Sequence, residues 1–398
     1  MKRWPQLPLP VLGLIFGRMV LLFTLPAEAI HGFGDFPHFY DLAALQGWPY
    51  LHYWVEFPPL FAFFNEILYL LAQGRPHVYE ALFAGGLIVM DAVSLCTFIH
   101  LRKRVWLEEG DWREWFYAVV LTALPYTWWY FDPLVVCFFM LALVGLEEKK
   151  EKWAGFWLGL GILTKLFPMV VIPALWKFLP RQKAIVTTLI ALVLPVLVYL
   201  SLFTISPGLT WTSLNAQGGK GSWETVWALL DGNYQTGNVG AGIDHYQPVN
   251  DMGSERNPSA IPSYLTLAVI GAAGFWFFLK SQAGQTRQWL ALIGATWCIL
   301  MIWSPGWSPQ WILMILPVLL LTLDQRKALL FVFTLVIINL LEWPVLLSRG
   351  YEQGLWVTAP VRTLLFLLVV LEWSTLLIPR RQQAAHLVDG GKTRRSNF

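Results

Sequence analysis

Residues 309–348 read PQWILMILPVLLLTLDQRKALLFVFTLVIINLLEWPVLLS, two apolar stretches separated by the short polar turn Asp324-Gln325-Arg326-Lys327. A helix that crosses the hydrocarbon core of a membrane needs about 20 mainly apolar residues. Stretches of this kind recur along the chain of 398 residues, of which 56% are hydrophobic and only 13% are charged. Soluble domains contain about 25% charged residues. We therefore predict an all-α polytopic membrane protein.

The apolar segments predict a bundle of roughly 10–13 transmembrane or partial helices, because most are close to the length that spans a membrane. Spans are expected near 10–30, 78–101, 114–131, 132–147, 184–205, 261–280, 289–303, 309–324, 328–348 and 359–379. The basic residues lie in short clusters between these spans, and such clusters usually face the cytoplasm. They are Lys2-Arg3, Arg102-Lys103-Arg104, Lys149/Lys150/Lys152, Arg181/Lys183, Lys280/Arg287, Arg326-Lys327 and Arg380-Arg381. The net charge of +3 therefore indicates topology and predicts no nucleic-acid partner.

Two segments are predicted not to cross the membrane, because alternating crossings keep the basic clusters on one side only if both segments turn back. Residues 58–73 begin with Pro58-Pro59 and are expected to form a re-entrant helix within a first external segment at 31–77. Residues 153–179 are expected to form a hairpin of two half-helices, broken at Pro168. Each half of the hairpin spans roughly 21 Å, against about 30 Å for the hydrocarbon core.

Residues 1–379 are expected to form a single membrane domain, followed by a basic cytoplasmic tail at 380–398. The largest piece outside the membrane is an external loop at 206–258, in which residues 221–232 would form a short helix that bears Glu224 and covers the site. The N-terminus resembles a cleavable signal peptide. We favour an uncleaved first span, because Arg18 interrupts its apolar run and cleavage after Ala29 would free the acidic loop that follows.

That acidic loop, residues 34–60, reads GDFPHFYDLAALQGWPYLHYWVEFPPL and contains no lysine or arginine. Asp35 is the acid nearest the end of the first span, and a carboxylate there can accept a proton from a hydroxyl nucleophile. Tyr40 and Asp41 follow about one or two helical turns later, and Glu56 precedes the two prolines. Asp35 is equally compatible with a plain N-cap of a short helix.

Three further polar residues are expected to meet this loop at the outer face. Asp132 lies in the aromatic run WWYFDP, a pattern that also suits an interfacial turn. An intramembrane lysine such as Lys165 costs about 2.5–3.5 kcal/mol on insertion scales and is usually kept for a partner or a ligand such as phosphate, although it can also snorkel to the interface. Gln310 lies in WSPGWSPQW, a turn that would hold a sugar by hydrogen bonds and ring stacking or form a simple interfacial turn.

The chain contains no motif of a soluble enzyme: no GxGxxG after a strand, no Walker A, no HExxH and no GxSxG. Asp35 and Asp41 do not form a tight DxD, and no His/Cys cluster has metal-ligand spacing, so no metal or cofactor is expected. His245 is a weaker candidate, better explained as a solvated loop residue. The cysteines Cys96, Cys137 and Cys298 form no CxxC pair and are expected to be small core residues.

A series of short motifs runs in a fixed order from about residue 10 to 325. The series is Asp35, Tyr40, Gly47-x-Pro49-Tyr50, Glu56-Phe57-Pro58-Pro59-Leu60, Asp132-Pro133, Thr164-Lys165-Leu166-Phe167-Pro168 with Pro173, and Gln310-Trp311 with Pro317. In order and spacing it resembles the integral-membrane glycosyltransferases of the GT-C fold. It is most similar to family 87, the polyprenyl-phosphate-mannose-dependent mannosyltransferases.

The resemblance implies a GT-C-type bundle with catalytic external loops. Such an enzyme transfers a sugar, with inversion and without a metal, from a polyprenyl-phosphate donor to a glycolipid or glycan acceptor. The resemblance makes Asp35 the catalytic base and has Lys165 face the donor phosphate. The residues expected to bind sugar or shape the site are Tyr40, Asp41, Glu56, Asp132 and Gln310. We expect a multi-pass protein of a bacterial plasma membrane, with its site on the outer face.

Two departures from the family pattern leave the sugar open. Phe57 stands where the family often has tyrosine, and Trp129-Tyr130-Phe131-Asp132 stands where many members have Gly-x-x-Asp. Two other classes also remain. A flippase or transporter of a lipid-linked sugar would share the broken helices but needs no exposed base. A structural membrane subunit would leave the intramembrane Lys165 and the acidic loop unexplained.

Overall fold

The computed structural model describes residues 7–107, 110–219, 221–237, 243–249 and 256–378. The described residues form helices and short helical turns joined by loops, and their β-structure is limited to isolated bridges. Five of the described helices are long and apolar enough to cross a membrane. The prediction of an all-α polytopic membrane protein is therefore confirmed.

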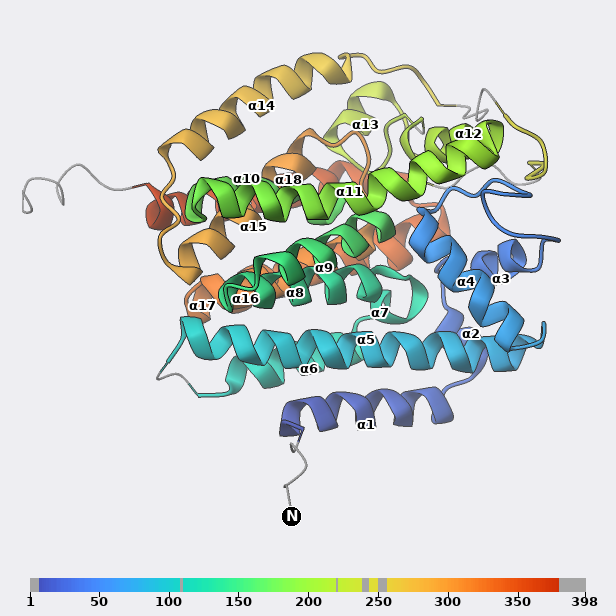
Figure 1. Ribbon diagram of the computed structural model, residues 1–398, viewed down its shortest axis with the longest axis horizontal. Helices are drawn as coiled ribbons and strands as arrows, with labels where there is room; N and C mark the ends of the chain where they lie inside the picture. Colours follow the sequence, from blue (N-terminus) through green and yellow to red (C-terminus); the bar gives the residue numbers. More distant parts are fainter. Residues whose placement is uncertain (1–6, 108–109, 220, 238–242, 250–255, 379–398) are drawn as a thin grey trace, which may run out of the picture.

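The helices have the following bounds. They are α1 Leu9–Thr24, α2 Ala27–His31, α3 Phe36–Ala43, α4 Pro59–Leu71, α5 Pro76–Val105, α6 Trp112–Ala123, α7 Tyr126–Trp129, α8 Asp132–Glu147, α9 Glu151–Thr164, η1 Phe167–Val170, α10 Val171–Phe178, α11 Arg181–Ile205, α12 Pro207–Gly218, α13 Val226–Asp231, α14 Ser263–Lys280, α15 Thr286–Trp303, η2 Pro309–Trp311, α16 Ile312–Thr322, α17 Gln325–Leu340, η3 Leu341–Leu346, η4 Leu347–Arg349, η5 Glu352–Gly354 and α18 Leu355–Leu377. Figure 1 shows most of the long helices side by side along one direction.

Each predicted span overlaps one or more of these helices, and three of the spans are divided. The span predicted at 328–348 runs from α17 into η3 and η4, with a kink at Trp343. The span predicted at 10–30 is α1 followed by α2, and the span at 114–131 is α6 followed by α7. The residues at these breaks, Leu25 and Leu124, are extended, and each precedes a proline. A proline disfavours the helical conformation of the residue before it, so both breaks have a local cause in the sequence.

The basic clusters of the described chain gather at one end of the bundle, as the topology argument requires. Figure 1 shows the connections of the long helices at two opposite ends. At the end with the basic clusters, which we call the basic end, side-chain hydrogen bonds and ion pairs link neighbouring elements. They pair Arg102 with Glu114, Thr286 with Glu147, Lys183 with Glu151, Arg287 with Asp324, and Lys327 with Glu372. We call the opposite end, where the aromatic and acidic loops lie, the loop end.

The segment expected to be a hairpin turns back on itself. Gly155 of α9 lies against Thr187 and Ile190 of α11, and Gly159, one turn later, lies against Ala191 and Leu194. Because residue numbers increase in the same direction along both helices at these contacts, α9 and α11 run parallel. Two parallel helices need a return between them, and η1 with α10 makes it. A Cβ on Gly155 would lie 2.8 Å from the Thr187 carbonyl oxygen, so this close packing depends on glycine.

The segment expected to be re-entrant is α4. Figure 1 shows α4 lying across the loop end at a steep angle to α5, rather than along the bundle. Its Phe61 packs on Phe83 of α5, with ring centroids 6.3 Å apart, and stacks on Phe131 at 3.9 Å. The segment therefore joins the first loop to the start of α5 without crossing the bundle.

The region predicted as an external loop at 206–258 contains more helix than expected. Residues Pro207–Gly218 form α12, which sequence reasoning missed, and the predicted helix at 221–232 is only Val226–Asp231. Glu224 precedes this helix and has a φ of +51°, so it was wrongly placed on it. The predicted tail at 380–398 lies outside the described residues.

Candidate functional site

Lys165 and Asp132 form an ion pair at the loop end. Asp132 is the first residue of α8, where Pro133 suits the start of a helix, and Lys165 follows the last residue of α9. Lys165 Nζ lies 2.8 Å from Asp132 Oδ1, with the lysine side chain 15% exposed and the aspartate 3%. The second carboxylate oxygen, Oδ2, is buried and has no hydrogen-bond partner in the described chain. The sequence predicted both residues for the site but not their pairing.

An aromatic wall surrounds the Lys165 ammonium group. Its Nζ lies 5.3 Å from the ring centroid of Phe131, 5.2 Å from that of Phe167 and 5.4 Å from that of Trp311. Ring faces attract a cation, most strongly where water is excluded. The ammonium group is therefore enclosed by three aromatic rings and Asp132, and little of the lysine side chain is exposed.

Gln310 lies beside this wall, in the short helical turn η2 that contains Trp311. It is buried, and its Oε1 has no hydrogen-bond partner in the described chain. Trp223 from the large loop covers the same turn, because its indole packs 6.3 Å from Trp311 and its backbone N–H donates to the Pro305 carbonyl at 3.2 Å. A Cβ on Gly306 would lie 2.2 Å from the Trp223 ring, so only glycine fits beneath it.

Asp35 stands at the N-cap position of α3, but its side chain makes no capping hydrogen bond to that helix. Its backbone N–H donates to the Trp129 carbonyl at 3.2 Å, which brings the loop against α7. This approach requires Gly34, since a Cβ there would lie 2.1 Å from Trp129 Cβ. The half-buried carboxylate is thus placed near the aromatic run that leads to Asp132, and the simple capping alternative does not describe it.

Glu56 pairs with His38, a residue that the sequence argument did not single out. His38 Nε2 lies 2.5 Å from Glu56 Oε1, with the imidazole 43% exposed and the carboxylate 5%. Burial alone would lower the pKa of His38, but the hydrogen bond and charge of Glu56, with the charges of Asp35 and Asp41, raise it overall. Glu56 was expected to bind sugar or shape the site, and this role stays a prediction; its buried carboxylate is paired with His38. The spacing of three residues between Asp35 and His38 was the available signal.

Tyr40 and Asp41 lie apart from this site. The Tyr40 hydroxyl donates to the Gly74 carbonyl at 2.7 Å, and its ring packs on Tyr69 and Tyr79. This contact fixes α3 to the turn after α4, and the role of Tyr40 in substrate binding stays a prediction. Asp41 is exposed on α3, within reach of His38 only through its charge.

Aromatic rings join the His38 pair to the Lys165 pair. His38 packs on Phe57 with ring centroids 5.9 Å apart, and Phe57 packs on Phe131 at 5.7 Å. The ring of Phe131 in turn contacts the Lys165 ammonium group. Beside it, Tyr130 is buried, and the charges of Asp35, Glu224 and Asp132 act on it.

Glu224 is a buried acid that the sequence argument underestimated. Its φ of +51° is a conformation that non-glycine residues rarely adopt, and its backbone carbonyl accepts a hydrogen bond from Arg362. Arg362 also binds Glu342 Oε1 at 2.6 Å. Burial, followed by the nearby charge of Glu342, raises the pKa of Glu224 well above its usual range. This network fixes the large loop to α18.

His245 was expected to be a solvated loop residue, and the structure corrects this. Its ring stacks on Trp54 with centroids 4.3 Å apart, and its Nδ1 lies 2.8 Å from the Trp54 carbonyl oxygen. His245 thus anchors the large loop to the first loop. In the described residues, no group of three or more His, Cys, Asp and Glu side chains is arranged to hold a metal.

No protein-family model and no curated protein matches this chain. The site must therefore be interpreted from its own residues.

An apolar groove lies among the membrane-spanning helices. It has a volume of about 580 Å³ and is lined by α10, α14 and α15, from Pro173 and Trp176 to Leu300 and Trp303. Figure 1 shows α14 along the edge of the bundle. The turn η1, which follows Lys165, packs on α15, one wall of this groove.

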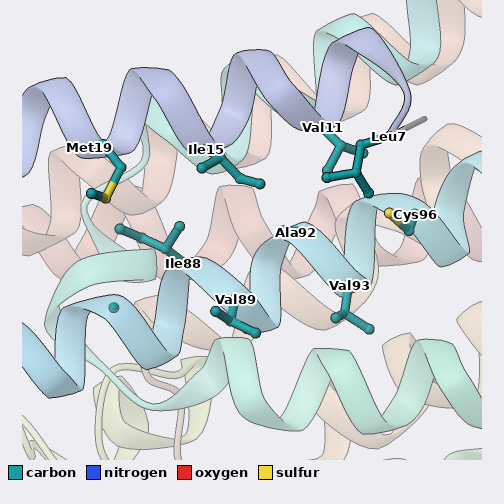
Figure 2. A pocket seen from close by; sticks show the side chains of 10 residues that line it. Leu7, Val11, Ile15, Met19, Ile88, Val89, Ala92, Val93 and Cys96 are labelled. Carbon is teal, nitrogen blue, oxygen red and sulfur yellow. The ribbon is translucent and has the colours of Figure 1, made fainter. Parts of the chain in front are cut away.

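A second apolar groove lies between α1 and α5. Figure 2 shows Val11, Ile15 and Met19 of α1 facing Ile88 and Cys96 of α5 across it. Its volume is about 350 Å³, and no charged side chain lines it. This groove therefore offers nothing that would orient a ligand.

Proposed function

We propose that this protein is a membrane glycosyltransferase of GT-C type that moves a sugar, most simply mannose, from a polyprenyl phosphate to an acceptor hydroxyl. The observation that carries the proposal is the Lys165–Asp132 pair, a partly desolvated cation at the loop end of the bundle. The turn η1, which follows Lys165, packs on α15, one wall of an apolar groove, and Asp35 is hydrogen-bonded to Trp129 of the aromatic run that ends at Asp132. This combination suits a substrate with a lipid tail, a phosphate and a sugar.

The proposed reaction begins with the donor phosphate at Lys165. The acceptor oxygen attacks the anomeric carbon as the bond from that carbon to the phosphate oxygen breaks, with inversion. The electron pair of the broken bond goes to the phosphate, where the ammonium charge stabilises it. Asp35 removes the acceptor's proton. Because the leaving group is already an anion, the remaining task is positioning.

The sugar would lie between Lys165 and the aromatic turn. Gln310 supports this placement, because its buried Oε1 lacks a partner and can accept a hydrogen bond from a sugar hydroxyl. The unpartnered Asp132 Oδ2 offers a second acceptor. Buried polar atoms without partners are rare in native proteins, and a bound ligand is one explanation for them.

The proposed location follows from charge and chemistry. The basic clusters share the end opposite the site, and such clusters usually face the cytoplasm, so the site would lie on the outer face. We propose a bacterial plasma membrane and a role in the synthesis of a glycolipid or membrane-anchored glycan.

The direct test is sugar transfer by the purified protein in detergent. Radiolabelled polyprenyl-phosphate mannose is the donor and a membrane lipid extract supplies the acceptor. Label should move to a new lipid or glycan product in a time- and enzyme-dependent manner. Binding of the donor without any transfer would contradict the enzyme and favour a flippase, which the hairpin α9–α10 and the adjacent groove also suit.

Replacement of Lys165 should weaken donor binding. In Lys165→Gln we expect the KM for the donor to rise about tenfold to a hundredfold, since hydrogen bonds to charged groups contribute about 1.5–3 kcal/mol. Lys177→Gln is the matched control, because this lysine lies on α10 at the opposite end of the hairpin, where it binds the Leu279 carbonyl. An unchanged KM in Lys165→Gln would show that the phosphate binds elsewhere.

A further inference from the structure

The proposed base, Asp35, has a neighbour suited to hold a proton. A carboxylic acid is a poor place for a proton at neutral pH, since its ordinary pKa is about 3.9, whereas that of histidine is about 6.5. His38 follows Asp35 by three residues on α3, a spacing that places two side chains on one helix face. A proton taken by Asp35 would therefore move downhill to this imidazole.

The geometry of His38 is that of an oriented proton acceptor. Nε2 faces the buried Glu56 Oε1 at 2.5 Å, which leaves Nδ1 for an incoming proton. The carboxylate is nearly inaccessible while the imidazole is almost half exposed. A buried carboxylate that fixes the tautomer and direction of an exposed imidazole is the arrangement that acid–base pairs of enzymes use. The ring is held from the side by Phe57.

We propose that His38, held by Glu56, is the residue that receives the acceptor's proton from Asp35. This inference rests on the proposed glycosyl transfer. The acceptor O–H bond breaks, the proton passes through the Asp35 carboxylate, and an N–H bond forms at His38 Nδ1. Asp35 returns to its ionised form, ready for the next acceptor, and His38 then releases the proton to water through its exposed face.

The charges around His38 determine the pH dependence. Burial lowers the pKa of this imidazole, but Glu56 from the loop before α4, with Asp35 and Asp41 from α3 itself, raises it above its ordinary value. The acceptor form is neutral, so kcat/KM should rise as the pH rises through this raised value. Without the Glu56 charge, burial would dominate and the same limb would move to lower pH.

The test is the pH profile of kcat/KM for wild type, Glu56→Gln and His38→Gln. We expect Glu56→Gln to keep an acidic limb that lies at lower pH than in wild type. His38→Gln should lose this limb, and its kcat should fall about a hundredfold, the lower end of what a positioned proton acceptor contributes. His77→Gln is the control, because this exposed histidine at the start of α5 should leave the profile unchanged. A merely structural role for His38 would lower activity at all pH values alike.

A second measurement makes the proton-acceptor inference independent of turnover. Histidine labelled with ¹³C at Cε1 allows all seven histidines to be titrated by NMR, and His38→Gln identifies the His38 signal. This signal should titrate above pH 6.5 in wild type and at lower pH in Glu56→Gln. An unchanged titration in Glu56→Gln, or identical pH profiles in wild type and both variants, would overturn the inference while transfer itself stands. Absence of transfer with the expected titration would instead contradict the proposed function.

Discussion

Asp35→Asn should lose about 10²- to 10⁴-fold in kcat, the range that a positioned general base contributes. Asparagine has nearly the same shape but cannot take a proton from the acceptor. The backbone bond from residue 35 to the Trp129 carbonyl does not involve the side chain, so the fold should persist. The measurement is transfer from radiolabelled polyprenyl-phosphate mannose under single-turnover conditions, with donor binding measured in parallel.

The control for this variant is Glu28→Gln, which neutralises an exposed acid on α2, seven residues before Asp35. It removes the same charge from the same face without touching the site, so its turnover should stay within about twofold. Full activity in Asp35→Asn, together with loss in Asp41→Asn, would move the base to the exposed acid of α3. Donor translocation that tolerates Asp35→Asn would support the flippase.

The membrane-spanning segments were predictable because the signal is local. About 20 apolar residues between basic turns suffice to predict a helix that crosses the bilayer, and the helices lie where these stretches predicted them. The breaks before Pro26 and Pro125 escaped prediction only because an apolar run conceals the extended residue before each proline. The GT-C resemblance and its implied roles stay predictions.

The site was predictable in part. Lys165 and Asp132 stood out because an ionised group in an apolar segment needs a compensating partner. Their mutual pairing depends on how α8 and α9 pack, and no pattern within either segment encodes it. The same limit hid the pairing of His38 with Glu56, which lie 18 residues apart. The hydrogen bond of the Tyr40 hydroxyl to Gly74, 34 residues away, was likewise not predictable, because sequence position alone does not show that contact.

Arg18 provides the largest expected effect on stability. Its side chain, 0% exposed, pairs with Asp91 of α5, which is 1% exposed. The guanidinium group also donates to the Thr127 carbonyl at 2.9 Å and lies 4.0 Å from the ring centroid of Trp128. One side chain of α1 therefore contacts both α5 and α7. The arginine that interrupts the first apolar run is thus held inside the bundle rather than exposed to lipid.

Arg18→Met should destabilise the protein by about 3–5 kcal/mol, because it leaves the buried Asp91 without its cation. Unfolding by SDS titration of the detergent-solubilised protein measures this loss. Lys327→Met is the matched control: it breaks a pair that also joins two helices, at 2.6 Å, but with the lysine side chain 47% exposed. Exposed pairs contribute only about 0–1 kcal/mol. Equal losses in the two variants would contradict the argument.

The double variant Arg18→Met/Asp91→Leu separates the ion pair from simple packing. When both charges are replaced by apolar side chains of similar volume, the cost of burying them disappears, and such replacements are often neutral or stabilising. Most of the stability lost in Arg18→Met should therefore return, short of the contacts to Thr127 and Trp128 that the arginine alone makes. If the double variant is as unstable as Arg18→Met, the guanidinium group stabilises the fold mainly through its contacts to Thr127 and Trp128. Its pairing with the charge of Asp91 then contributes less.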